Sequence, residues 1–186
     1  MLAVRSLIRK ETRREDEPLN IITFSFDYEY ECKVAEAGHN MYYWTSGYEF
    51  SWGAQQDKVP KNFIKMLPDN IPAYVDFDLI LCPNRGVYNI CNGLARHLHI
   101  PIICLEHDAP TEEYKTHNHQ NWNNLSNIDG DINVFSSQKC RDGWGKMGYI
   151  AEITNESFID VWNNILSQAA DIVYTRQLVP QTYQRN

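Results

Sequence analysis

Glu106 and His107 are adjacent in the chain, and together they could supply a general base. A histidine titrates near neutral pH, and a neighbouring carboxylate can orient it or tune its pKa. Such a pair could take a proton from a hydroxyl group of a bound molecule. Adjacent side chains on an extended chain point in opposite directions, so one of the two is expected to face a given cleft. We predict His107 and Glu106 as the catalytic candidates.

Three short apolar runs end just before polar residues that could bind a substrate. The runs are residues 77–82, 101–105 and 131–135, with a helical pattern between the first two. Such a pattern is typical of a βαβ unit, and open parallel sheets bind ligands outside the carboxyl ends of their strands. The substrate-binding candidates that these runs and the first strand bring to that edge are Ser25, Asn84, Arg85 and Ser136.

The predicted helix at residues 86–99 begins directly after Asn84 and Arg85. Its first backbone amides and its dipole could bind an anion there, and Arg85 could add a planar fork for a carboxylate or a phosphate. The chain has no glycine-rich phosphate-binding fingerprint at this place. A structural cap of the helix is the alternative to a phosphate site.

Residues 111–127 are polar and rich in asparagine, and they are predicted to form a long loop. Trp122 lies within this loop and could either stack on a sugar or pin the loop to the core. His117 and His119 are near the Glu106-His107 pair in sequence, but a zinc site needs convergent ligands on defined elements. We therefore expect a solvated loop here and no metal site.

Composition limits the class of protein. The chain has 186 residues, 43% of them hydrophobic, which suits one domain. Its net charge of −7 argues against a nucleic-acid partner, since such binding relies on clustered lysine and arginine. Five cysteines without a CxxC pair suggest reduced thiols, and no membrane span or signal peptide is visible. A cytoplasmic location is expected.

Three parts are expected along the chain. Residues 1–18 form a charged arm outside the core, either a solvated helix or tail or a docking arm for a partner or an anionic surface. Residues 19–175 form a Rossmann-like α/β domain with a mostly parallel sheet of five to seven strands flanked by helices. Residues 176–186 form a flexible tail.

Within the domain, the first strand is expected near residues 19–26, the next near 41–44 and a third near 63–67, with a loop at 48–58. Asp27 is expected to cap a helix that ends before Gly38. A closing helix is predicted at about 156–172. Asn155 could cap this helix, and Trp162 lies in the middle of its apolar stripe and should anchor it.

Five segments also resemble a known family: LNIITFSFDYEYE, EAGHNMYYW, DFDLILCPN, HIPIICLEHDAP and GDINVFSSQKCRDGWG. Arriving in this order over residues 19–145, they resemble the amino-terminal, acceptor-side domain of GT-B glycosyltransferases, particularly bacterial and phage sequences of the glycosyltransferase family 1 type. In that family, the strand end that carries Glu106 and His107 faces the cleft between two domains. The resemblance adds no support for a bound metal.

The resemblance also implies what is missing. A GT-B enzyme has a second Rossmann-like domain that holds most of the nucleotide-sugar contacts, whereas residues 157–172 resemble the helix that closes such enzymes. We expect no bound cofactor, and a nucleotide-sugar donor only if a partner supplies the donor domain. The chain is then either a glycosyltransferase-like protein acting with a separate partner or as a homodimer, or a non-enzymatic binding or accessory protein.

Overall fold

The computed structural model describes residues 2–14, 16–44, 59–66, 71–117 and 119–172. Within them, seven parallel strands form one sheet in the order β3-β2-β1-β4-β5-β6-β7. The α/β prediction is thereby confirmed, including the number of strands. The strands are β1 Asn20–Phe24, β2 Asn40–Trp44, β3 Phe63–Met66, β4 Leu79–Cys82, β5 Ile102–Glu106, β6 Ile132–Phe135 and β7 Tyr149–Ile150.

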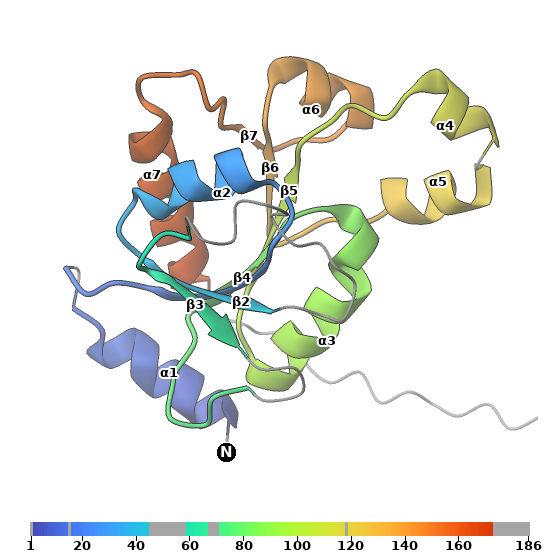
Figure 1. Ribbon diagram of the computed structural model, residues 1–186. Helices are drawn as coiled ribbons and strands as arrows, with labels where there is room; N and C mark the ends of the chain where they lie inside the picture. The colour runs from blue at the N-terminus through green and yellow to red at the C-terminus, as the bar shows by residue number, and fades with distance from the viewer. Residues whose placement is uncertain (1, 15, 45–58, 67–70, 118, 173–186) are drawn as a thin grey trace, which may run out of the picture.

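Helices cover both faces of this sheet (Figure 1). They are α1 Leu2–Thr12, α2 Tyr28–Ala35, η2 Arg85–Val87, α3 Tyr88–Leu98, α4 Glu112–His117, α5 His119–Ser126, α6 Gln138–Trp144 and α7 Phe158–Asp171. No helix among the described residues is long and apolar enough to span a membrane.

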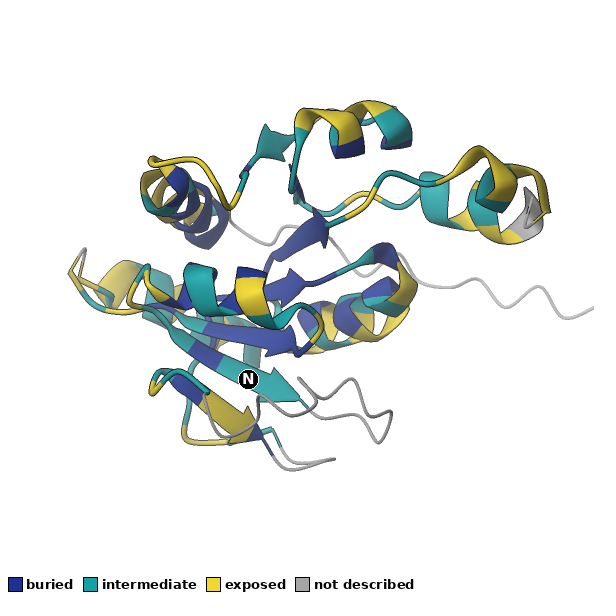
Figure 2. Ribbon diagram, turned by 45° about the horizontal axis from the view of Figure 1, so that its top comes forward, coloured by how far each residue is buried: buried dark blue, intermediate teal, exposed yellow. Residues whose placement is uncertain are grey.

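The core consists of two apolar layers, one on each side of the sheet. Alternate residues of a strand point to opposite faces, so Ile21 packs with α2 and α7 while Ile22 packs with α3. The strands at the centre are buried on both faces, as Figure 2 shows in dark blue. Sequence runs such as LILC and IICLE are therefore continuously apolar rather than alternating.

The strand order reverses direction between β1 and β4. The chain moves outward from β1 to β2 and β3, returns to β4 beside β1, and then continues to β5, β6 and β7. The connections that leave β1 and β4 therefore diverge, and a crevice opens at the carboxyl ends of these strands.

Local signals at α2 are as the sequence indicates. Asp27 Oδ1 accepts a hydrogen bond from the backbone amide of Tyr30 at 3.0 Å, and Gly38 has a φ of +84° just beyond the end of the helix. Residues 48–58 and 176–186, for which a loop and a tail were predicted, lie outside the described residues.

The predicted loop at residues 111–127 is wrong, because the structure has the helices α4 and α5 there. The Thr111 hydroxyl accepts from the amide of Tyr114 at 3.0 Å and caps α4, and Lys115 pairs with Glu112 at 2.6 Å. The abundance of polar residues concealed the apolar side of α5, where Trp122 and Leu125 pack on Trp144. The helix α6 and the strand β7 were not predicted from the sequence.

The closing helix is present as α7, but its start differs from the prediction. Ser157 is the N-cap residue, and Asn155, two residues earlier, accepts a hydrogen bond from the Ser157 amide at 2.9 Å. Trp162 is 0% exposed and lies in the core layer that α2 shares. The buried face is wider than predicted, since it also includes Leu166 and Ala170.

The charged arm forms α1, and it docks on the domain through its polar face. Arg9 Nε lies 3.1 Å from Asp78 Oδ1, and Asp78 is 3% exposed. Arg5 pairs with Asp76 at 2.6 Å, and both of these side chains are about two-fifths exposed. This docked helix differs from the expectation of a solvated arm, because ion pairs with residues about 70 positions later in the chain hold it.

We predict that Trp162→Ala lowers the free energy of unfolding by about 3–5 kcal/mol, the range for truncating a buried large aromatic side chain. Asn163→Ala, on the exposed side of the same helix, should change it by less than about 0.5 kcal/mol. Urea unfolding of both variants checks this. A near-native stability of the Trp162 variant would contradict the packing of α7 described above.

We also predict unequal roles for the two arginines of α1. Arg9→Met should lower the free energy of unfolding by about 1–3 kcal/mol, because Asp78 stays buried and loses Arg9. Asp78 then keeps its hydrogen bond from the Asn20 amide at 2.7 Å. Arg5→Met removes an exposed ion pair and should cost at most about 1 kcal/mol. Equal losses in urea unfolding would show that burial of Asp78 is not what matters.

Candidate functional site

The carboxyl ends of the central strands bring most of the predicted site residues to one edge of the sheet. Ser25 follows β1, Asn84 and Arg85 follow β4, Glu106 ends β5, and Ser136 follows β6. This placement confirms the prediction that Asn84, Glu106 and Ser136 share an edge. It follows from the parallel pairing of all these strands.

A cleft of about 470 Å³ opens at this edge. Four predicted residues line it, namely Asn84, Arg85, Glu106 and His107. The lining residues that sequence reasoning missed include Phe26, Asp108, Thr111, Tyr114, Leu125 and Trp144. Phe26 and Asp108 each directly follow a predicted site residue, so their sequence position was a usable signal. Tyr114 and Leu125 come from α4 and α5, which the sequence analysis did not foresee.

Glu106 and Arg85 join the ends of β4 and β5. Glu106 Oε1 accepts a hydrogen bond from the Arg85 backbone amide at 2.7 Å, and it lies 3.1 Å from Arg85 Nη1. The first backbone amide of η2 is thus occupied by a carboxylate of the protein itself. This contact supports the structural-cap alternative over an anion site formed by that amide.

The Arg85 guanidinium is buried, with its side chain 1% exposed. Its central carbon lies 4.6 Å from the Trp144 ring centroid and 5.6 Å from that of Phe135. Nε donates to the carbonyl of Ile128 at 3.2 Å. Nη1 makes the ion pair with Glu106, and Nη2 has no hydrogen-bond partner among the described residues. In this position, the guanidinium does not present the open fork that was expected for a carboxylate or a phosphate.

Burial controls the protonation of both catalytic candidates. It raises the pKa of Glu106 to about 7, although the Arg85 charge acts in the opposite direction. Burial also lowers the pKa of His107, against the influence of Asp27 and Asp108. Near neutral pH, Glu106 is therefore close to its midpoint and His107 favours its neutral form.

His107 lines the cleft, but only 9% of its side chain is exposed. Its Nδ1 is 3.6 Å from Asp27 Oδ2, and its ring meets the Tyr30 ring edge-on at 4.8 Å. Its Nε2 is buried without a hydrogen-bond partner in the described part of the chain. The ring would have to move before Nε2 could accept a proton from a molecule in the cleft, so general-base catalysis by His107 stays a prediction.

The remaining three predicted residues, Ser25, Ser136 and Trp122, lie outside the lining of the cleft. Ser25 directly follows β1 and is 5% exposed. The Ser136 hydroxyl donates to the carbonyl oxygen of His107. Trp122 stacks on Trp144 with ring centroids 5.3 Å apart, and Lys115 lies over its ring at 5.5 Å. Of the two alternatives for Trp122, this arrangement favours pinning α5 to the core over an open sugar-stacking platform.

The His117 ring bonds within its own helix, and the side chain of His119 lies outside the described part of the structure. His117 Nδ1 lies 3.0 Å from the carbonyl oxygen of Glu113 within its own helix. Across the described residues, no group of three or more His, Cys, Asp or Glu side chains has the geometry to hold a metal ion.

We predict that Glu106 makes stability fall as the pH rises. Its pKa in the folded state lies above its ordinary value of 4.5, so between about pH 4.5 and 7 the folded chain holds a proton that the unfolded chain releases. Between pH 4.5 and 8, the free energy of unfolding of the native protein should fall by about 1–3 kcal/mol relative to that of Glu106→Gln. Urea unfolding at both pH values measures this difference. A difference that stays constant or grows in favour of the native protein would contradict the raised pKa.

Comparison with protein-family models, with curated proteins and with solved structures finds no match to this chain. The resemblance to GT-B glycosyltransferases therefore rests on the sequence segments alone. The sheet order establishes a Rossmann-like α/β fold without identifying a family.

Proposed function

We propose that this chain is a glycosyltransferase-like, acceptor-type domain whose cleft binds a neutral, hydroxyl-rich small molecule of the sugar class. The combination of aromatic and polar side chains in the cleft is the observation that supports this proposal most. Sheet order alone would not, because one fold serves many functions.

The lining of the cleft suits a sugar. Phe26 is 44% exposed, and Tyr114 approaches the cleft from α4. Aromatic rings of this kind can cover the apolar face of a pyranose, while a few placed polar groups fix its orientation. Asn84 and Asp108 provide an amide and a carboxyl group, which can bond to hydroxyl groups.

Binding fits the geometry better than autonomous transfer does. Glu106 is engaged by Arg85, and the free nitrogen of His107 is buried, so neither group is poised at the cleft surface. A general base must come within hydrogen-bonding reach of the proton that it removes. In this proposal, transfer requires a partner that supplies the nucleotide-sugar contacts, either a separate protein or a second copy of the chain. The partner could also bring the Asp27–His107 pair into an active arrangement.

A nuclear magnetic resonance titration of the whole chain with methyl glycosides of common hexoses and N-acetylhexosamines tests binding. We expect saturable shifts at the Leu125 methyl groups and at the Trp144 indole, both of which line the cleft. Tyr114→Ala should weaken binding about tenfold, because it removes a stacking surface worth roughly 0.5–1.5 kcal/mol beyond the area it buries. Tyr74→Ala is the matched control, since Tyr74 is 88% exposed and outside the cleft lining.

Absence of saturable binding across this panel would refute the proposal. Equal weakening by the two tyrosine variants would move the binding site away from the cleft. The chain by itself should release no product from nucleotide-sugar donors in the presence of any glycoside that binds. Sustained donor-dependent turnover would instead favour an autonomous transferase.

A further inference from the structure

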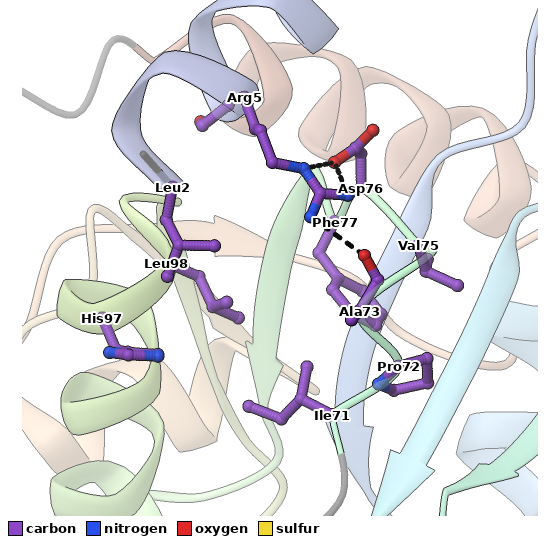
Figure 3. A pocket seen from close by; sticks show the side chains of 11 residues that line it. Leu2, Arg5, Ile71, Pro72, Ala73, Val75, Asp76, Phe77, His97 and Leu98 are labelled. Atoms are coloured by element: carbon purple, nitrogen blue, oxygen red, sulfur yellow. Dashed lines mark hydrogen bonds and ion pairs between the residues drawn. The ribbon is translucent and has the colours of Figure 1, made fainter.

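A second pocket lies at the opposite edge of the sheet, where the strands begin. It has a volume of about 230 Å³ and is enclosed by α1, by residues 71–77 and by the last turn of α3. Figure 3 shows Leu2 and Leu98 on the helical side of this hollow and Ile71 and Phe77 across from them. Since the cleft described above is formed by the carboxyl ends of the strands, the two sites share no lining residue.

The interior of this pocket is apolar, and its two oppositely charged side chains, Arg5 and Asp76, are paired with each other. Arg5 Nε donates to Asp76 Oδ1 at 2.8 Å, and Arg5 Nη1 donates to the carbonyl of Ala73 at 2.9 Å. These charges cancel at the rim, as the dashed lines in Figure 3 indicate. A charged ligand would lose its hydration here without gaining an unpaired opposite charge. A neutral ligand would not pay this desolvation cost.

The size of the pocket corresponds to one aromatic ring. An apolar cavity of about 150 Å³ lined by leucine, isoleucine and phenylalanine accepts benzene. The pocket of this chain is larger and has His97 at its edge, which could meet one hydroxyl group. The residues thus specify both the bulk of a ligand and the single polar group that it can carry.

We propose that this pocket is a second binding site, for a small neutral aromatic molecule such as a phenol. This second site is independent of the sugar binding proposed for the cleft, because neither the location of the pocket nor the class of its ligand depends on that binding. Three residues of α1, namely Leu2, Arg5 and Ser6, form one wall. A bound ring therefore connects α1 to the domain.

Such a connection has a consequence for α1 that can be measured. No residue of α1 is fully buried, and its apolar residues Val4, Leu7 and Ile8 are each more than half exposed. The contacts that hold this helix are mainly polar, including the hydroxyl of Ser6, which donates to the carbonyl of His99 at 3.0 Å. A ligand that needs α1 as a wall must stabilise the docked position of that helix.

Methyl resonances of the intact chain during a phenol titration test the site directly. We expect saturable shifts at Leu2, Ile71, Val75 and Leu98 and no shift at Leu125, which lines the cleft. Benzoate and benzylammonium, the charged probes of similar size, should bind at least about tenfold more weakly than phenol. Shifts that do not saturate, that occur at Leu125 alone, or that are larger for a charged probe overturn the proposal.

Two tryptophan variants on one helix locate the site by a second route. Leu98→Trp fills the pocket and should lower phenol affinity at least about tenfold. Ile90→Trp, at a position of α3 that is 52% exposed and outside the pocket, should leave the affinity unchanged. Equal affinity of the two variants refutes the assignment. If Leu98→Trp fails to fold, the methyl shifts of the native chain decide.

Hydrogen exchange then tests the coupling to α1. At ten times the Kd, the amides of α1 should exchange about tenfold more slowly, because undocking would have to release the ligand first. The same phenol concentration should leave exchange in α5 unchanged. Protection of α5 without protection of α1 would contradict the proposed wall.

Discussion

The contact between Glu106 and Arg85 connects the core of the sheet to everything that surrounds the cleft. One carboxylate oxygen receives the backbone amide of Arg85 and lies beside its guanidinium, so the ends of β4 and β5 are joined at one atom. Both side chains are almost completely buried, and removing one partner of such a pair would leave an uncompensated charge. This constraint fixes the start of η2 and, through it, the direction in which α3 leaves the sheet.

The same contact organises the aromatic wall. With Arg85 held by Glu106, its flat guanidinium stacks on Trp144, and Trp144 in turn stacks on Trp122 of α5. The indole nitrogen of Trp144 also donates to the carbonyl of Asp108 at 2.9 Å, which ties α6 to the strand end beside the cleft. The helices α4 and α5 project from the body in Figure 1. The stacked rings of Trp122 and Trp144 connect α5 to the buried Arg85–Glu106 pair. This stacking positions Leu125 and Trp144, which line the cleft.

The two ends of the sheet use charge in different ways. At the carboxyl ends, carboxyl groups and aromatic rings surround an open cleft, and burial raises the pKa of Glu106. At the amino ends, Asp76 and Asp78 receive the arginines of α1 and neutralise them. The consequence is an unusual orientation for an amphipathic helix, with its polar face against the protein and much of its apolar face exposed. Ion pairs rather than burial of apolar side chains keep α1 in place.

Elements whose signals are local could be predicted from the amino-acid sequence. Apolar runs specified the central strands, Asp27 and Gly38 marked the limits of α2, and the stripe around Trp162 specified α7. The sequence also placed Asn84, Glu106 and Ser136 on one edge, because parallel strands that begin at one edge of a sheet must end at the other. How these side chains are arranged relative to one another follows from the tertiary structure. Whether His107 faces the cleft or the core, whether Arg85 is open or stacked, and whether Trp122 meets a ligand or Trp144 all depend on contacts between segments far apart in the chain, which no local pattern encodes.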